Sequence, residues 1–558
     1  DQACNYSTTV VSVNGSTTAP SFAAEPSSQA SGITFSSVSS TGMTINWTAG
    51  DGANSLMVVK EGSAVNANPG DGDTLAPNTA FGSGTQLGTG NYAVYNSIGN
   101  SVSITGLLKA RTYYVKVYTF NGSAGSENYL TSSPASGNQV TVPGEIVSTG
   151  LNTVSTSYSS GAAWVGGIVP TQYDNVTIAA NDIINLGSTQ KCYNLTVNSG
   201  GKIVATTSQV LQVYGTSLSC AGTLGDPLAS ASLLTLEFGG NLTISGSGTI
   251  APYRIRPVTA LSNVSVTIDA PTTTVTYGVA GISVDNTGND NVTFTINAGK
   301  TVNVLGNFTT NSSATGLGAG SAILNVYGTL NITNTFNNTV ATGKTYALTV
   351  YNGGLISTGR FNLSAAHQVQ ASTATVNFGG EIKVNGTSST AVDCSHPTIT
   401  SAVVGGGTFS TTSSVGLGVA LGNASGLDIT TGPIRTTTRN FNVNNNFSFV
   451  GTAAQVSGSD FPATVNSLTI NNVAGVTLTS ATSMTGKLTL TSGLLSTGGL
   501  LTLKSGDCCT SAVVSTVTGG SVTGNVIVER NIPAGFRAYR LLSPATTGGT
   551  IKANWQEN

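Results

Sequence analysis

Hydrophobic and polar positions alternate along most of this chain, in two regions that differ in the length of their alternating segments. Between about residues 21 and 143, alternating segments such as residues 43–47, 56–60, 101–107 and 113–118 are separated by turn residues. From about residue 146 to 520 the alternating segments are shorter, with Val, Leu, Ile or Phe at every second position and Thr, Ser or Asn between them. Period-two alternation predicts half-buried β-strands, so we expect an all-β protein.

The second region repeats a strand–corner–strand unit with glycine at its corners. Residues 194–203, 234–244 and 294–304 are examples, and the spacing is about 20 to 30 residues. Because a unit this small cannot bury its own apolar side, copies of it must stack on one another. We therefore predict a long parallel β-helix (β-solenoid) over residues 144–520. The alternative is a string of further sandwiches.

The pattern predicts four segments in all. Residues 1–20 are polar and are expected to form a tail or leader strand. An antiparallel β-sandwich is expected over residues 21–143, followed by the β-helix over residues 144–520. Residues 521–558 are expected to form a C-terminal β segment that begins a further module.

The composition limits the classes of binding partner that this chain is expected to have. Charged residues make up only 8% of the chain, and Lys+Arg 20 against Asp+Glu 22 gives a net charge of −2. Nucleic acids and anionic membranes are therefore not expected partners, since both attract basic surfaces. No stretch approaches the roughly 20 apolar residues of a membrane span, and no charged-then-apolar signal peptide is present, so the chain numbered from Asp1 is expected to be a mature one.

Residues of the first region carry a resemblance to a known family. Trp47 lies where fibronectin type III domains have a core tryptophan, and Leu107 stands six residues before Tyr113, as in the tyrosine corner of that family. The resemblance implies a fibronectin III-like sandwich over residues 21–143. The sequence departs from the family in a long insertion at about residues 62–90, which is rich in Gly, Asn, Asp and Pro.

Two further segments resemble secreted surface proteins of Bacteroidota. Residues 163–170, which include Trp164, together with residues 174–178 and 192–197, look like the opening of the β-helix region in those proteins. Residues 526–544, followed by Ile551 and residues 554–557, resemble the segment after their repeats. In that family the segment leads to further domains and to a type IX secretion signal. The sequence stops at Asn558 without that signal, so we expect either processing or a partial chain.

The six cysteines are too few to form the framework of the fold. Cys192 and Cys220 lie 28 residues apart, about one turn of the predicted coil, so a bridge between neighbouring turns and a pair of buried thiols are both open. Cys508 and Cys509 are adjacent, and vicinal or cross-coil pairing is expected rather than metal binding. The residues expected to have structural roles are Trp47, Leu107, Tyr113, Trp164, Cys192, Cys220, Cys508 and Cys509.

Few groups are candidates for chemistry, and each has a simpler structural interpretation. They are the acidic and amide run Asp285, Asn286, Asn289, Asp290 and Asn291, residues 393–396, the basic pairs Arg254 with Arg256 and Arg435 with Arg439, and the short O-glycosylation-like motif at residues 73–75. The acidic and amide run is expected to be a solvated turn, residues 393–396 are expected to have a structural or loop role, and the basic pairs are expected to flank corners. No catalytic residue, cofactor or metal is therefore expected.

These observations favour an extracellular structural or adhesive protein, a rod-like stalk or fibre component without catalysis. Glycans or neighbouring surface proteins are the expected partners, together with self-association end to end. The alternative is a β-helix enzyme that binds or cleaves polysaccharides, which would need several Asp, Glu, Lys or Arg side chains converging on one face.

Overall fold

The chain is nearly all β in the residues that the structure describes. The computed structural model describes residues 21–225, 233–258, 263–275, 282–283, 291–309, 321–337, 345–362, 375–378, 381–395, 403–506, 511–515, 517–529 and 531. Its only helical segments in these ranges are two 3-10 turns, η1 (Gly161–Ala163) and η2 (Val165–Gly167). The chain divides into two compact units, Asp1–Glu145 and Ile146–Asn558, so the division falls two residues after the boundary expected at residue 143.

The first unit contains two antiparallel sheets. One has the strand order β1 (Ser31–Ser36), β2 (Met43–Thr48) and β5 (Ser101–Ile104). The other has the order β4 (Asn91–Ser97), β3 (Asn54–Glu61) and β6 (Thr112–Asn121), and β6 also pairs with β7 (Asn128–Tyr129) and β8 (Ala135–Val140). The four segments expected as strands from their alternation are β2, β3, β5 and β6, although β5 ends at Ile104 rather than at residue 107.

Two hydrophobic clusters flank the second sheet. The first lies between the sheets and includes Trp47, Val59 and Tyr113. The second includes Val58 and Tyr118 of the sheet together with Val65, Leu75 and Leu87 of the insertion. Residues 62–90 therefore cover the outer face of β3 and β6, which explains why five successive residues of β3 are buried instead of every second one.

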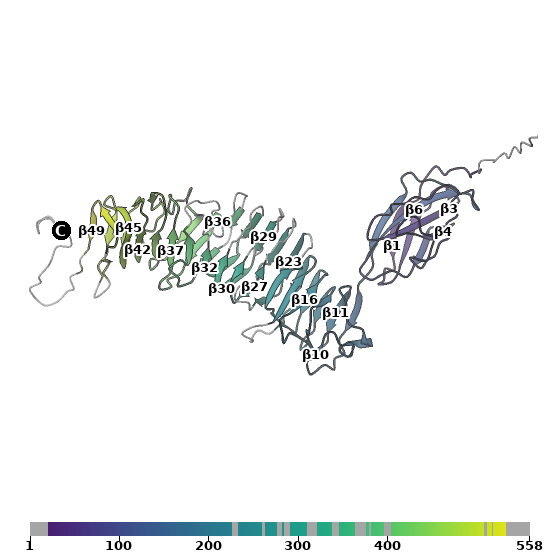
Figure 1. Ribbon diagram of the computed structural model, residues 1–558, viewed down its shortest axis with the longest axis horizontal. Coiled ribbons are helices and arrows are strands. Elements are labelled where there is room, and N and C mark those ends of the chain that lie inside the picture. The colour runs from purple at the N-terminus through teal and green to yellow at the C-terminus, as the bar shows by residue number, and fades with distance from the viewer. Residues whose placement is uncertain are drawn as a thin grey trace, which may run out of the picture. The chain divides into compact units, whose positions relative to one another are not determined.

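The second unit is built from parallel strands that pair at a regular interval. Over most of its length each strand pairs in parallel with the strand three places later, as β11 does with β14 and β14 with β17. Three strands per turn of chain produce three parallel ladders, an arrangement consistent with a β-helix. The labelled strands β11, β16, β23, β29 and β37 follow one another in chain order along this unit in Figure 1.

The first ladder starts beside β9 (Gly144–Val147), which pairs with β11. It consists of β11 (Asp174–Ile178), β14 (Leu195–Val197), β17 (Ser217–Cys220), β20 (Leu242–Ser245), β23 (Val264–Ile268), β26 (Val292–Ile296), β29 (Ser321–Val326), β31 (Thr345–Val350), β33 (Thr375–Phe378), β36 (Val403–Thr411) and β38 (Ile434–Asn440).

The second ladder ends on the later parts of β36 and β38. It consists of β10 (Thr156–Ser157), β12 (Ile183–Asn185), β15 (Lys202–Val204), β18 (Thr223–Gly225), β21 (Thr249–Ala251), β24 (Thr272–Val275), β27 (Thr301–Val304), β30 (Thr329–Asn337), β32 (Leu355–Asn362) and β34 (Glu381–Val384).

The third ladder passes through the later parts of β30 and β32. Its other strands are β13 (Gln190–Cys192), β16 (Gln209–Val213), β19 (Leu234–Phe238), β22 (Arg254–Pro257), β25 (Ile282–Ser283), β28 (Phe308–Thr309), β35 (Val392–Cys394), β37 (Gly418–Leu421), β39 (Asn446–Phe449), β42 (Ser467–Asn471), β45 (Lys487–Ser496) and β47 (Val513–Val514).

Two shorter ladders complete the later coils. One joins β40 (Gln455–Val456), β43 (Val476–Thr477), the later part of β45 and β48 (Gly520–Thr523). The other joins β41 (Thr464–Val465), β44 (Thr482–Met484), β46 (Leu501–Leu503) and β49 (Val526–Val528).

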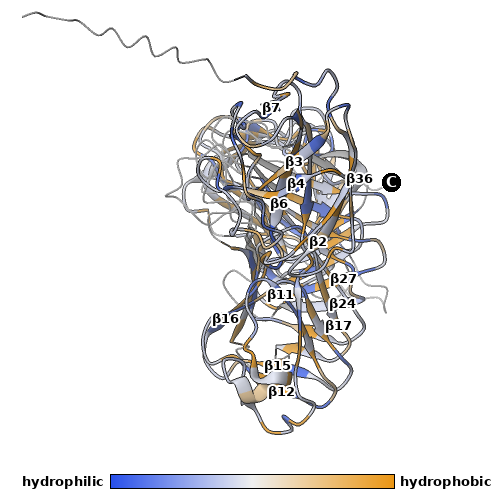
Figure 2. Cartoon of the chain, turned by 90° about the vertical axis from the view of Figure 1, so that its right-hand side faces the viewer, coloured by the Kyte–Doolittle hydropathy of each residue, from blue (hydrophilic) through white to orange (hydrophobic). Residues whose placement is uncertain are grey.

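The register of the ladders explains the alternation in the sequence. Val176 pairs with Leu195 and Leu195 with Leu218, and all three side chains are buried. Their neighbours Thr177 and Thr196, also paired, are only half-buried. Hydrophobic and hydrophilic residues are accordingly interleaved along the chain in Figure 2. Because outward positions are hydroxyls and amides, the surface of the ladders needs few charges.

The interior changes along the second unit. The early coils are filled mainly by aliphatic side chains, with Tyr158, Trp164 and Phe238 also buried there, whereas a continuous chain of phenylalanine contacts begins at Phe294. Consecutive ring centroids along it are 5.0 to 6.4 Å apart. Its members are Phe294, Phe308, Phe336, Phe361, Phe409, Phe441, Phe447 and Phe461.

Candidate functional site

The three residues of the fibronectin-like signature lie together in the core of the first unit. Trp47, Leu107 and Tyr113 belong to one buried cluster. The indole N–H of Trp47 donates to Ser55 Oγ at 3.2 Å. The Tyr113 hydroxyl accepts a hydrogen bond from the backbone N–H of Leu108 at 2.8 Å, which is the contact that defines a tyrosine corner. Burial raises the pKa of Tyr113, so its hydroxyl stays protonated.

Trp164 lies at the beginning of the parallel ladders and belongs to the hydrophobic core of the second unit. Its indole N–H donates to the carbonyl oxygen of Tyr158 at 2.8 Å, and the two rings meet edge to face at 4.9 Å. The Tyr158 hydroxyl donates to the carbonyl oxygen of Lys191 at 2.9 Å. These two aromatic residues therefore close the first coil with satisfied polar groups.

Cys192 and Cys220 are free, buried thiols. Cys192 ends β13 of the third ladder and pairs with Val213, whereas Cys220 ends β17 of the first ladder and pairs with Val197. Their sequence spacing is that of one coil, but they lie on different ladders, so no bridge between neighbouring turns forms. Burial raises the pKa of both thiols, that of Cys220 to about 11. Cys508 and Cys509 lie outside the described residues.

The other motifs singled out in the sequence have structural partners or lie outside the described residues. Asp393 is buried, accepts from Ser395 Oγ at 2.7 Å and forms an ion pair with Arg360 at 2.5 Å. Cys394 is a buried free thiol, and His396 lies outside the described residues, as do residues 285–290. In the O-glycosylation-like motif, the Thr74 hydroxyl donates to Glu127 at 2.8 Å and Leu75 is buried.

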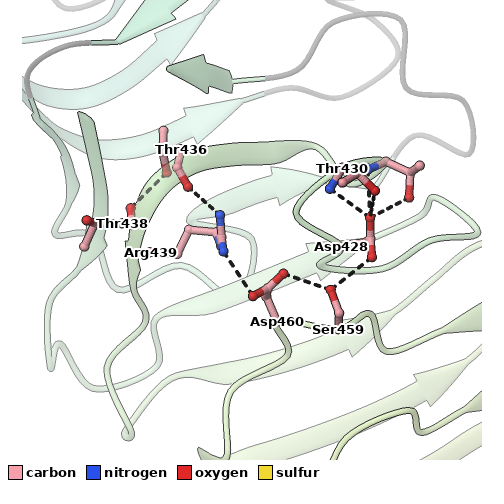
Figure 3. Close-up of polar contacts among 8 residues, drawn as sticks. Asp428, Thr430, Thr436, Thr438, Arg439, Ser459 and Asp460 are labelled. Carbon is pink, nitrogen blue, oxygen red and sulfur yellow. Dashed lines mark hydrogen bonds and ion pairs between the residues drawn. The ribbon is translucent and has the colours of Figure 1, made fainter. Parts of the chain in front are cut away.

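A polar cluster joins two loops of the later coils to the end of β38, and it is the candidate site considered for chemistry. Asp428 Oδ1 accepts from the backbone N–H groups and the hydroxyls of Thr430 and Thr431, at 2.7 to 2.9 Å. The Ser459 hydroxyl lies 3.0 Å from Asp428 Oδ2 and 2.9 Å from Asp460 Oδ2 (Figure 3). Arg439 completes the cluster with an ion pair to Asp460 at 3.1 Å.

The cluster lacks the chemistry of a hydrolase pair. Hydrogen bonds from Thr430 and Thr431 hold the pKa of Asp428 well below its usual range, so this carboxyl stays ionised and is no proton donor at neutral pH. Asp460 is neutralised by Arg439, which also donates to the carbonyl oxygen of Thr436. With the acceptor oxygens of Asp428 occupied from within the chain, the cluster acts as a clamp that fixes these loops.

Ion pairs across neighbouring coils were not predictable from the sequence. Arg256 binds the buried Glu237 through Nε at 2.7 Å and Nη2 at 2.6 Å, and Gln212 donates to the second carboxylate oxygen at 2.7 Å. Each of these residues comes from a different coil. From the sequence alone, Arg256 and Arg439 are interpreted as corner residues, because their partners are distant along the chain. Knowledge of the register of the ladders would be needed to match each arginine with its acidic partner.

Several classes of site are absent from the described ranges. There, no group of three or more His, Cys, Asp or Glu side chains is placed to hold a metal ion. A search of the same residues finds no helix long and apolar enough to span a membrane. No family model, no curated protein and no solved structure matches this chain.

Proposed function

We propose that this protein is an extracellular structural or adhesive protein, in which a fibronectin III-like sandwich precedes a parallel β-helix that acts as a stalk or fibre component. The observation that carries the proposal is the repeated parallel pairing of each strand with a strand two or three places later, over more than ten coils. Stacked coils satisfy their backbone groups from above and below, which suits a load-bearing element. The Leu108–Tyr113 hydrogen bond supports the fibronectin-like assignment of the first unit.

The chemistry of the surface supports a binding role over a catalytic one. The outward positions of the ladders are mostly Thr, Ser and Asn, and both carboxylate oxygens of Asp428 accept hydrogen bonds from within the chain. Such a surface offers many hydroxyl and amide groups to glycans or neighbouring proteins. The resemblance of residues 163–197 and 526–557 to Bacteroidota surface proteins supports secretion by the type IX route and a location at the cell surface.

The end of the described coils supports self-association as a further prediction. Val514 pairs with Leu488, and Val522 pairs with Leu495. Leu488 and Leu495 are at most 1% exposed, whereas Val514 is 50% and Val522 is 37% exposed in the part of the chain that the structure describes. Exposed inward positions favour contact with another β element, as in end-to-end assembly.

Electron microscopy of the full chain, combined with a turnover assay, tests the proposal. We expect elongated particles and no release of sugars or unsaturated products from a panel of polysaccharides that includes uronic-acid polymers. Catalytic turnover would favour the polysaccharide-cleaving alternative. Globular particles would contradict the structural role.

A further inference from the structure

One corner of the parallel coils carries a continuous column of polar and aromatic side chains. Asp269, Asn297, Tyr327 and Tyr351 each directly follow a strand of the first ladder, in four consecutive coils. The backbone N–H groups of Asn297, Tyr327 and Tyr351 donate to the strand end one coil earlier, at 3.1, 2.9 and 2.9 Å. These four side chains, called the corner column below, are therefore spaced by about 4.8 Å along the ladder.

The two tyrosines of the corner column form one aromatic unit at the surface. Their ring centroids lie 3.8 Å apart, with an angle of 11° between the ring planes. Tyr327 is 37% exposed and Tyr351 is half-buried. A hydrogen bond with the phenol of Tyr351 raises the pKa of Tyr327, so the Tyr327 hydroxyl is neutral near pH 7. Stacking and hydrogen bonding hold the pair in one arrangement before any ligand arrives, which lowers the entropy cost of binding.

The other half of the corner column supplies hydrogen-bonding groups without net charge. Asn297 Nδ2 donates to Asp269 Oδ1 at 3.0 Å, and Lys300 Nζ lies 3.7 Å from the same oxygen. The side chain of Asp269 is 44% exposed, so its carboxylate is accessible to solvent. The ion pair cancels the charge of the carboxylate while leaving acceptor capacity for a hydroxyl group.

A rank of hydroxyls runs beside the corner column. Thr272, Thr301 and Thr329 begin consecutive strands of the second ladder and are paired in register. Thr329 follows Tyr327 by two residues, and Thr301 follows Asn297 by four. The corner therefore presents an aromatic surface, an amide, a carboxylate and regularly spaced hydroxyls side by side.

We propose that the corner column binds a neutral glycan chain aligned with the axis of the coils. Sugar rings have apolar C–H faces that pack against aromatic rings, and their hydroxyls both donate and accept hydrogen bonds. The tyrosine pair provides the packing surface, and Asn297, Asp269 and the threonine rank provide the hydrogen bonds. The inference rests on the adhesive function proposed above and names its ligand class and its site.

Affinity electrophoresis and calorimetry of the full chain test this site directly. The probes are dextran and laminarin as neutral glucans and alginate as an acidic one. We expect binding to a neutral glucan, weakened about threefold to tenfold by Tyr351→Ala or Tyr327→Ala, the loss of one aromatic packing contact. Tyr351→Phe retains the ring and its stacking and loses only the phenol hydrogen bond, so we expect a smaller loss of binding than in Tyr351→Ala.

Tyr214 provides the matched control. It lies at another corner, where its ring faces Lys191 and its hydroxyl donates to Gln212. Tyr214→Ala is expected to leave glucan binding unchanged. Thermal unfolding of each variant shows whether the coils are intact, and Asn297→Ala, a surface change, offers a second loss-of-binding variant that keeps the aromatic stack.

Three results would overturn the inference: no binding of the parent chain to either glucan, binding to alginate alone, or equal losses in the Tyr351→Ala and Tyr214→Ala variants. Elongated particles that bind no glucan would refute this site while leaving the structural function in place. Globular particles would refute the proposed function independently of any binding result.

Discussion

The two units of this protein bury the apolar sides of their β-strands in different ways. The first unit packs two antiparallel sheets around a few large side chains, and Trp47, Tyr113 and Val59 share one cluster. The second unit stacks short parallel strands, and its coils contact mainly the coils before and after them. We infer that the first unit unfolds as a whole, whereas damage in the second spreads only to neighbouring coils.

The two units also differ in the interactions that specify their folds. In the first unit these are single contacts, such as the hydrogen bond from the Leu108 N–H to the Tyr113 hydroxyl. In the second unit the register specifies the fold, because a slip of one residue would turn a whole row of aliphatic side chains outward. Each substitution below tests this contrast.

The largest expected effect is the loss of Trp47. Trp47→Ala removes a fully packed indole from the sandwich core and is expected to cost about 3–5 kcal/mol, a large share of the stability of a small domain. We expect protease cleavage throughout the first unit, measured by limited proteolysis with mass spectrometry. Phe336→Ala in the middle of the second unit carries a similar local cost but should expose only the adjoining coils. Cleavage spread over the entire second unit would break the contrast.

The loss of Trp164 tests the start of the ladders. Trp164→Ala removes the ring that packs on Tyr158 and the hydrogen bond to its carbonyl oxygen, at an expected cost of about 3 kcal/mol. Hydrogen exchange should accelerate in β11 to β16 and remain unchanged from β37 onward. Uniform acceleration along all ladders would mean that the coils unfold as one cooperative unit.

Tyr113→Phe is a smaller and sharper test of the first unit. It removes only the hydroxyl that accepts from Leu108, so we expect a loss of about 1 kcal/mol in the free energy of unfolding, measured by chemical denaturation. Tyr95→Phe is the control, because the Tyr95 hydroxyl donates to the carbonyl oxygen of Ile98 at an exposed position. Equal losses in both variants would remove the special role of the corner.

Asp428→Asn is expected to have the smallest effect, and one that depends on pH. The pKa of Asp428 is lowered in the folded protein, so its stabilising contribution is present above its unfolded pKa of about 3.9 and is lost as the pH falls toward the folded pKa. We expect the variant to be less stable by under about 1 kcal/mol near pH 7, with the difference vanishing in strong acid. If the difference in unfolding free energy between the parent and Asp428→Asn grew on acidification, the stabilising role of the ionised Asp428 would be contradicted.

Alternation and composition were sufficient to predict the β class and the parallel character of the second region. The strands around Trp47 and Tyr113 were found because each carries a period-two pattern with turn residues on both sides. The second cluster of the first unit was missed, because nothing in the Gly-rich segment 62–90 marks Val65, Leu75 and Leu87 as a cover for β3.

The polar contacts between coils were not predictable for a different reason. Arg439 and Asp460, or Arg256 and Glu237, meet only because the register of the ladders places distant residues side by side. For the same reason, the spacing of Cys192 and Cys220 could not decide between a bridge and two buried thiols. One coil of separation brings residues together only when both lie on the same ladder, and the irregular coil length concealed the ladder to which each belongs.

Distances between spin labels along one column test the stacking of coils most directly. Thr223, Thr329 and Thr408 lie on the second ladder. The register of its strands places Thr329 four coils and Thr408 seven coils after Thr223. Cysteine pairs at Thr223 with Thr329 and at Thr223 with Thr408 are labelled in a chain whose Cys4, Cys508 and Cys509 are replaced by serine, because the buried thiols should not react. Electron spin resonance should give narrow distances that reflect backbone separations of about 19 and 34 Å. Broad distributions, or distances that do not increase with the number of coils, would contradict the stacked architecture.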